Sequence, residues 1–188
     1  MSGKRLNRPT VESSAPPSRS TIQRFNGSTI FIANRQRTRK VNPRLLKQLT
    51  RTLLAELNAE ANELEINLVA TSEMTRLNET YLLHAGSTDV IAFDYSSPRL
   101  QTSNPKPQIH GEIFICLDEA ILQARQFGTS WPSEVVRYLI HGILHLLGFD
   151  DTNPGARRRM KREENRMLRR LSARFSLAQL SRPDKLSA

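Results

Sequence analysis

The segment from residue 111 to residue 151, GEIFICLDEAILQARQFGTSWPSEVVRYLIHGILHLLGFDD, contains the succession of elements that decides the fold class. Its first seven residues are rich in apolar side chains, as in a buried strand. Asp118 can cap a following helix, and Gly128 can end that helix in a left-handed conformation. A second helix is then expected to begin at Ser130 or Ser133 and to carry the two histidines of the segment.

The flanking sequence continues this alternation of strands and helices. Asn42 and Pro43 are residue types of a helix N-cap and first turn, and leucines then repeat along one helical face. Further strands are predicted at residues 28–34, 64–70 and 88–95, and further helices from Pro43, from Ser72 to Leu83 and after Gly155. The chain is therefore expected to be α/β or α+β, with a central mixed sheet of about four strands packed with helices.

The positive charge lies at the two ends of the chain. The 188 residues have a net charge of +10, and residues 1–40 contain nine Lys or Arg and one Glu. Residues 156–174 contain nine Lys or Arg and two Glu, whereas residues 41–155 contain eight basic and fourteen acidic side chains. Basic ends favour a polyanionic partner such as nucleic acid, with ordinary solvated surface as the alternative for each.

One folded domain is expected, at residues 28–174, because residues 1–27 are rich in Ser, Pro, Thr and Arg and show no apolar period. We predict that residues 1–27 form a disordered basic tail and residues 175–188 a flexible C-terminal tail. No apolar run reaches the roughly 18 residues that cross a bilayer, and no secretory signal is visible, so a cytoplasmic protein without a membrane is expected. Cys116 is the single cysteine, so no disulfide partner is expected either.

Metal-ligand residue types are concentrated at the end of the quoted segment. His141 and His145 are four residues apart, so a helix places both imidazoles on one face. Gly148 can end that helix and turn the chain, which lets Asp150 or Asp151 return toward the histidines. The spacing His-x3-His-x2-Gly-x2-X matches the metzincin zinc site and puts Asp151 at the third ligand. Because zinc accepts carboxylate oxygen as well as imidazole nitrogen, a three-ligand zinc site is predicted on a helix and the turn after it.

The residue after the first histidine argues against a peptidase. Metallopeptidases of this spacing have a glutamate there, which acts as general base on the metal-bound water. This chain has Gly142 at that position. A zincin-like metallopeptidase would therefore need a glutamate from elsewhere in the fold, and it is kept as a second alternative.

Three stretches carry a family resemblance. HGILHLLGFDD (141–151) resembles the H-G-x-L-H-L-x-G-[YF]-D-H signature of the YbeY-type endoribonucleases, which are bacterial ribosomal RNA maturation factors. LNETYLLHAGSTDVIAF (77–93) is similar to the family's L-N-x2-Y-R-x4-P-T-D-V-L-S-F block, and GEIFICLDEAILQA (111–124) resembles its G-D-I-x-I-C element. The resemblance extends over residues 28–171. It implies a small α/β domain, one zinc ion per chain, and cleavage of single-stranded RNA during rRNA maturation.

The chain departs from the family pattern at two positions. Asp151 stands where the family has its third histidine ligand, and Asp150 corresponds to the family's preceding Asp, so Asp151 is the expected ligand. An anionic ligand lowers the Lewis acidity of the ion. Leu82 stands where the family has an arginine suited to RNA phosphate. Arg137, one turn before His141, is the nearest basic replacement, with a solvated helix arginine as the alternative.

The resemblance and the charge pattern lead to one functional hypothesis. The chain is expected to be a metal-dependent endoribonuclease, with zinc or another divalent ion, that acts on rRNA and the small ribosomal subunit in ribosome biogenesis and quality control. The expected site residues are the ligands His141, His145 and Asp151 and the substrate contacts Thr88, Asp89 and Arg137. The RNA backbone is expected to meet the basic C-terminal helix, at Arg157, Arg158, Arg159, Lys161 and Arg162.

Two parts of this hypothesis stay open at the level of sequence. No residue is identified as a separate general base, and Asp150 suits either that role or support of a ligand histidine. The alternative function is a ribosome-biogenesis factor that binds RNA without cleaving it and whose ion is structural. The departures at Leu82 and Asp151 favour that alternative.

Overall fold

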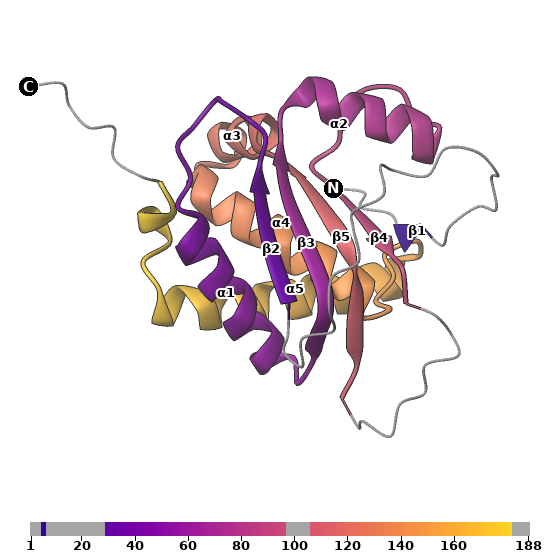
Figure 1. The fold of residues 1–188 in the computed structure, drawn as a ribbon, viewed down its shortest axis with the longest axis vertical. Coiled ribbons are helices and arrows are strands. Elements are labelled where there is room, and N and C mark those ends of the chain that lie inside the picture. Colours follow the sequence, from indigo (N-terminus) through magenta and orange to yellow (C-terminus); the bar gives the residue numbers. More distant parts are fainter. Residues whose placement is uncertain (1–4, 7–28, 97–105, 182–188) are drawn as a thin grey trace, which may run out of the picture.

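A mixed sheet with helices on both faces forms the protein (Figure 1). The computed structural model describes residues 5–6, 29–96 and 106–181. The strands are β1 (Arg5–Leu6), β2 (Thr29–Asn34), β3 (Glu60–Val69), β4 (Val90–Asp94) and β5 (Gln108–Cys116). The helices are α1 (Pro43–Glu56), α2 (Thr71–Leu77), η1 (Asn78–Leu82), α3 (Leu117–Phe127), α4 (Trp131–Leu146), α5 (Pro154–Arg174) and η2 (Leu177–Leu180).

The strand order is β1-β4-β5-β3-β2. β4 is antiparallel to β5, and the other neighbouring pairs are parallel. The predicted α/β class with about four strands is confirmed, and the two-residue β1 is an addition to it.

The two faces of the sheet support two apolar clusters. In β5, Ile113 and Ile115 belong to the main core, whereas the alternate residues Phe114 and Cys116 belong to a smaller one. α1 and α4 pack on the main-core face, and α5 packs against both of these helices. Figure 1 shows α4 and α5 behind the sheet and α2 near its upper edge. The side chain of Met74 in α2 is buried in the smaller cluster. No helix among the described residues is long and apolar enough to span a membrane.

Local capping explains where three of the helices begin. The side chains of Asn42, Ser130 and Asn153 accept hydrogen bonds from the backbone N–H three residues later, at 2.9 to 3.4 Å. Each of these helices also has a proline in its first turn, where the missing N–H costs no hydrogen bond. The predicted start of α1 at Asn42 is confirmed, and of the two starts left open for α4, Ser130 and Ser133, the structure has Ser130 as the N-cap.

Asp118 does not cap α3, in contrast to the prediction. α3 begins at Leu117, so Asp118 lies inside the helix rather than at its N-cap. The Asp118 carboxylate accepts hydrogen bonds from the Thr71 backbone and the Thr38 hydroxyl, both at 2.8 Å. Burial alone would raise the pKa of Asp118, but these hydrogen bonds hold it below its usual value. Asp118 therefore links the starts of α2 and α3 to the segment before α1.

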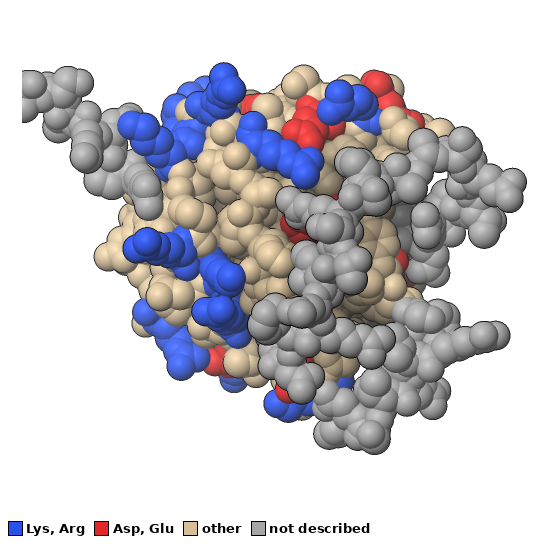
Figure 2. Space-filling view, in the orientation of Figure 1, with Lys and Arg blue, Asp and Glu red and all other residues tan. Residues whose placement is uncertain are grey.

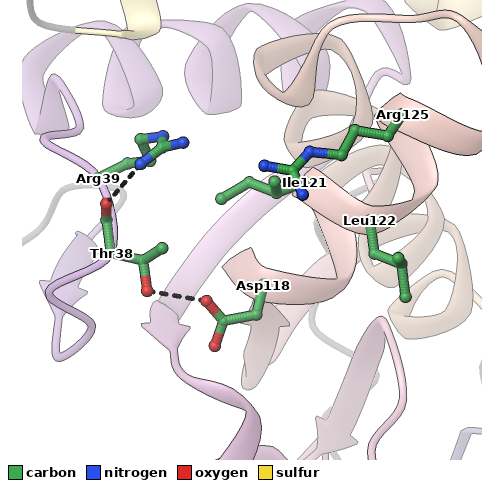
Figure 3. Close-up of a pocket in the computed structure, with 6 residues that line it drawn as sticks. All are labelled: Thr38, Arg39, Asp118, Ile121, Leu122 and Arg125. Atoms are coloured by element: carbon green, nitrogen blue, oxygen red, sulfur yellow. Dashed lines mark hydrogen bonds between the residues drawn. The ribbon is translucent and has the colours of Figure 1, made fainter.

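The Asp118 contacts border a surface pocket of about 430 Å³ (Figure 3). Its lining residues are Thr38, Arg39, Asp118, Ile121, Leu122 and Arg125. None of the site residues predicted from the sequence lines it.

The helix predicted from Ser72 to Leu83 differs from the structure in two ways. α2 begins one residue earlier, and it continues as the π-helix η1 rather than as a regular α-helix. The segment ends at Leu83, whose φ of 56° is left-handed. The predicted extent of the helical segment is nevertheless correct within one residue.

The sequence predicted a tail without regular structure at each end of the chain. In the predicted N-terminal tail, Arg5–Leu6 pairs with β4, and the other residues of that tail lie outside the described ranges. At the other end, Leu180 is fully buried in the main core, and Ser181 forms a β-bridge with Val41. For residues 175–181 the structure differs from the predicted flexible tail, because Leu180 fills a place in the core, and residues 182–188 lie outside the described ranges.

Candidate metal centre

α4 presents His141 and His145 from its C-terminal half. The helix ends at Leu146 with Leu147 as its C-cap, and Gly148 follows with a φ of 87°, a left-handed conformation that favours glycine. The Gly148 N–H donates to the His145 carbonyl at 2.9 Å, which satisfies one of the last helical acceptors. The chain then reverses and carries Asp151 back to the two histidines.

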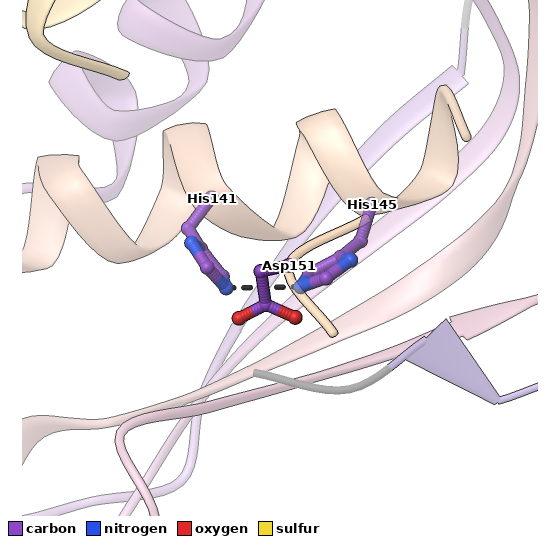
Figure 4. Close-up of side chains that lie close together, drawn as sticks. All are labelled: His141, His145 and Asp151. Atoms are coloured by element: carbon purple, nitrogen blue, oxygen red, sulfur yellow. Dashed lines mark hydrogen bonds between the residues drawn. The ribbon is translucent and has the colours of Figure 1, made fainter. Parts of the chain in front are cut away.

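The three predicted ligands converge (Figure 4). One ligand atom of each residue lies within 4.8 Å of the others, and the two histidine Nε2 atoms are 2.9 Å apart. All three residues are buried, with exposed fractions of 6%, 2% and 6% for His141, His145 and Asp151. Zinc holds such ligands at about 2.0 to 2.2 Å, so ligand atoms of a tetrahedral site lie about 3.4 Å apart. The distance between the two Nε2 atoms is close to that spacing, and the donor set of two imidazoles and a carboxylate fits the ion.

Both histidines are oriented by partners on their other ring nitrogen. His141 Nδ1 lies 2.6 Å from Glu164 Oε1, and His145 Nδ1 lies 3.1 Å from the Phe149 carbonyl. Nδ1–H donation to these oxygens leaves each Nε2 as the lone-pair donor for a metal. Burial alone would raise the pKa of Glu164, but the hydrogen bond with His141 and the charge of Lys161 lower it. Glu164 is therefore held as a carboxylate.

From the sequence alone, no role was assigned to Glu164. It is 3% exposed and lies on the face of α5 that also buries Met160 and Met167. An acidic side chain in phase with an apolar helical stripe was the available signal. The same helix contains many arginines, so its sequence was interpreted mainly as a basic surface.

The structure distinguishes between the two aspartates. The exposed Asp150 carboxylate accepts a hydrogen bond from the Thr152 backbone at 3.1 Å. Asp151 is buried in the cluster, and its backbone carbonyl accepts a hydrogen bond from Arg157 Nε at 3.2 Å. Asp151 is therefore the aspartate that lies where a third ligand is needed. Glu164, rather than Asp150, is the carboxylate that contacts a ligand histidine.

Gly142 faces the sheet and lies away from the cluster. A Cβ atom at this position would lie 2.8 Å from Ile113 Cγ2, closer than real contacts of this kind. Only glycine allows α4 to approach β5 this closely. A metallopeptidase glutamate therefore has no room at this position of the helix.

Thr88 and Asp89 precede β4 and bond locally. Asp89 Oδ1 accepts hydrogen bonds from Thr88 Oγ1 at 3.2 Å and from the Val90 backbone at 3.0 Å. Both residues are partly buried, and neither belongs to the metal cluster. Their contact with substrate stays a prediction.

Arg137 lies between α4 and α5. Its guanidinium is 3.5 Å from Glu134 and 3.9 Å from Glu164, and it donates a hydrogen bond to Asn165 at 3.0 Å. The side chain is only 17% exposed. These contacts tie Arg137 to the second carboxylate oxygen of Glu164, and its predicted contact with substrate also stays a prediction. Leu82 packs beside the smaller apolar cluster.

We predict that Glu164→Gln will lower the affinity for zinc by about 10-fold to 100-fold, because a neutral amide orients the His141 ring less strongly. Competition with a chromogenic chelator measures this affinity. Glu163→Gln is the matched control, since Glu163 pairs with Arg166 and makes no contact with either histidine. Equal affinities in the two variants would contradict the orienting role of Glu164.

Comparison with known proteins identifies the family. The family model described as "Endoribonuclease YbeY" matches residues 31–172. The "Endoribonuclease YbeY" of Chlorobium phaeovibrioides is 34% identical over 140 residues, which cover 74% of this chain and 89% of that protein. The protein of that name from Myxococcus xanthus is 38% identical over 125 residues, which cover 66% of this chain but only 42% of that longer protein.

A solved structure has the same fold. The solution structure of TM1509 from Thermotoga maritima is similar with a TM-score of 0.53 and 22% identity, over 84% of this chain and 99% of that one. The family match spans α1 to α4 and most of α5, and it includes His141, His145 and Asp151. The chain therefore belongs to the YbeY family.

Proposed function

We propose that this chain is a zinc-dependent endoribonuclease that cleaves single-stranded RNA during rRNA maturation, on the small ribosomal subunit in the cytoplasm. The observation that carries the proposal is the buried cluster of His141, His145 and Asp151 in a chain of the YbeY family. The relatives compared above are named endoribonucleases. The histidine and carboxylate ligands suit zinc in a site with a position left for water.

The ligands of the site and the residues that orient them have different roles. A bound zinc ion would supply Lewis acidity toward a phosphoryl oxygen and a more acidic water. Glu164 and the Phe149 carbonyl fix the imidazole rings, so that binding needs little reorganisation of His141 and His145. The low exposure of the three ligands limits competition by bulk water.

The basic surface of α5 is suited to the RNA backbone. This basic surface begins beside the loop that carries Asp151, whose backbone carbonyl accepts a hydrogen bond from Arg157. Arg158, Arg159 and Arg162 follow on the same helix and are exposed. Exposed guanidinium groups attract phosphates and displace the counterions of RNA.

Reversing Arg158, Arg159 and Arg162 to Glu is expected to weaken binding of single-stranded RNA. The slope of log K against log salt should fall by about 2, because each lost phosphate contact removes about 0.7 for a single strand. Titrations at several salt concentrations measure both quantities. The control reverses the exposed Arg37, Arg44 and Arg51, which lie on or before α1. The same loss in both triple variants would assign the effect to net charge rather than to α5.

The test of the proposed activity is cleavage of one RNA in two forms. The zinc-loaded chain should cleave the single strand and leave the same sequence intact in a duplex. His141→Ala and His145→Ala should bind the RNA with little change but should no longer cleave it. Cleavage that survives in both variants would refute a metal-dependent reaction at this cluster.

A second candidate is an RNA-binding biogenesis factor with a structural ion. Two observations favour it: the anionic Asp151 among the ligands, and the packing of Leu82 beside an apolar cluster. This candidate predicts that the zinc-loaded chain binds RNA and small subunits but cleaves neither. It also predicts that loss of zinc lowers thermal stability and RNA affinity together.

A further inference from the structure

The face of the sheet opposite α4 carries a row of aligned side chains across four strands. The pairing registers place Phe31 of β2 beside Glu65 of β3, Glu65 beside Glu112 of β5, and Glu112 beside Phe93 of β4. Neighbours in such a row point to the same face of the sheet. Two glutamates therefore lie side by side in the central strands, with an aromatic ring at each end.

A second row lies next to the first. It places Glu63 of β3 beside His110 of β5, and the Tyr95 backbone, just after β4, donates to the His110 carbonyl at 2.8 Å. The Tyr95 and His110 rings meet edge to face, with centroids 5.8 Å apart. We call Phe31, Glu63, Glu65, His110, Glu112 and Tyr95 the acidic sheet face.

Large parts of the acidic sheet face are open to solvent. Phe31 and Tyr95 are 41% and 42% exposed, and the side chain of Glu63 is 61% exposed. Figure 1 is viewed from this side, with β2 and β3 in front of α4. In Figure 2, which has the same orientation, Lys and Arg gather on the left, over α1 and around the segment before it.

Negative charge is concentrated in the centre of this face, at Glu65 and Glu112. Like charges on neighbouring strands destabilise a sheet, yet neither Glu65 nor Glu112 has a hydrogen bond or ion pair with any described residue. Burial and the charge of Glu65 raise the pKa of Glu112, and Arg35 opposes them only in part. The pair therefore weakens the folded state.

Asn67 adds a second unsatisfied group to the same face. It lies two residues after Glu65 and is fully buried, and neither its amide nitrogen nor its amide oxygen has a partner within the described ranges. An unpaired buried amide costs free energy, as the two neighbouring carboxylates do. Three polar side chains of the central strands thus lack hydrogen-bond partners among the residues that the structure describes, and all three can accept hydrogen bonds.

Arg35 shows which chemistry this face accommodates. Its guanidinium lies 5.9 Å from the centre of the Phe114 ring, in the row of Asn67, and pairs with Glu73 at 2.9 Å. An arginine held between an aromatic ring and a carboxylate is a favourable arrangement. Phe31 and Glu65 offer the same two groups one row away, at the open part of the face.

We propose that the acidic sheet face binds a basic polypeptide segment of a partner protein, with arginine side chains inserted between Phe31 and the Glu65–Glu112 pair. RNA does not suit this face, because its phosphates would be repelled. A metal ion does not suit it either, since the three-residue metal group found in the described part of the chain is the histidine cluster. This inference does not depend on the proposed RNA cleavage.

Binding of a labelled peptide to the full chain tests the proposal. The probe is an eight-residue peptide of alternating arginine and glycine, compared with the same peptide carrying citrulline, which keeps the shape but removes the charge. Glu65→Gln with Glu112→Gln should weaken binding of the arginine peptide by about tenfold or more, and the citrulline peptide should bind as weakly to the unchanged chain. The same double variant should melt at a higher temperature, because the repulsion is gone. Lost binding together with raised stability excludes misfolding as the cause.

The matched control is Glu79→Gln with Glu119→Gln, which removes the same charge outside the acidic sheet face. Three outcomes would overturn the proposal: equal weakening by the two double variants, equal binding of both peptides, or no binding of the arginine peptide at all. Self-association in sedimentation that disappears only with the Glu65 and Glu112 changes would assign the face to a second copy of the chain, which also overturns it. Phe31→Ala should weaken binding severalfold and leave RNA binding unchanged.

Discussion

Asp151→Ala is expected to lose its zinc and, with it, RNA cleavage. Two imidazoles alone rarely retain zinc against chelators, so we expect the metal affinity to fall by more than about 100-fold. Zinc content after dialysis and the rate of single-strand cleavage measure the two losses. Asp150→Ala is the control, because that exposed carboxylate is turned to Thr152, and this variant should keep both properties. If Asp151→Ala retained metal and rate, Asp151 would not be a ligand.

Asp151→His should retain zinc and change the pH dependence. A third imidazole removes one negative charge beside the ion, so more positive charge remains on the metal. If a deprotonated water limits the reaction, the pH at which cleavage rises should move downward. If the zinc-loaded Asp151→His variant had an unchanged pH profile, a deprotonated metal-bound water would not limit the reaction.

The second large effect is expected at Gly142. Gly142→Glu would place a carboxylate between α4 and β5, where even the added Cβ atom would lie 2.8 Å from Ile113 Cγ2. Overpacking and burial of an unpaired charge together should lower the free energy of unfolding by more than about 3 kcal/mol. Urea denaturation measures this loss. No peptidase activity is expected, although the change restores the residue type of the metallopeptidase motif.

Two further variants test the cause of this instability. Gly142→Ala should destabilise less, since overpacking is offset by the gain of about 1 kcal/mol in helix propensity. In an Ile113→Ala background the same change should be neutral or stabilising, because the colliding methyl group is gone. Independent effects of the two changes would contradict a steric role for Gly142.

The sequence predicted those features whose physical causes are local. Asn42 and Ser130 cap their helices through hydrogen bonds to the backbone three residues on. The approach of His141, His145 and Asp151 follows from helix geometry and from one left-handed glycine, all within 11 residues of sequence. Such features need no knowledge of the rest of the chain.

The features that escaped prediction depend on contacts between distant segments. Asp118 accepts from Thr71 and Thr38, which are 47 and 80 residues away, so its capping preference was overridden. Glu164 reaches His141 across 23 residues of sequence. The place of Leu180 in the core likewise exists only once α1 and α4 have packed. No local pattern encodes these partners.

The separation of α5 from the acidic sheet face affects how the chain meets a large polyanion. α5 lies behind the sheet, and its exposed arginines begin beside the loop that carries Asp151, whereas the acidic sheet face lies in front (Figure 1). Near an RNA-rich particle, attraction to these arginines favours approaches in which the side of the metal cluster faces the RNA. A larger share of encounters then has the productive orientation, which raises the association rate. This gain decreases at higher salt, because salt shortens the range of the electrostatic field.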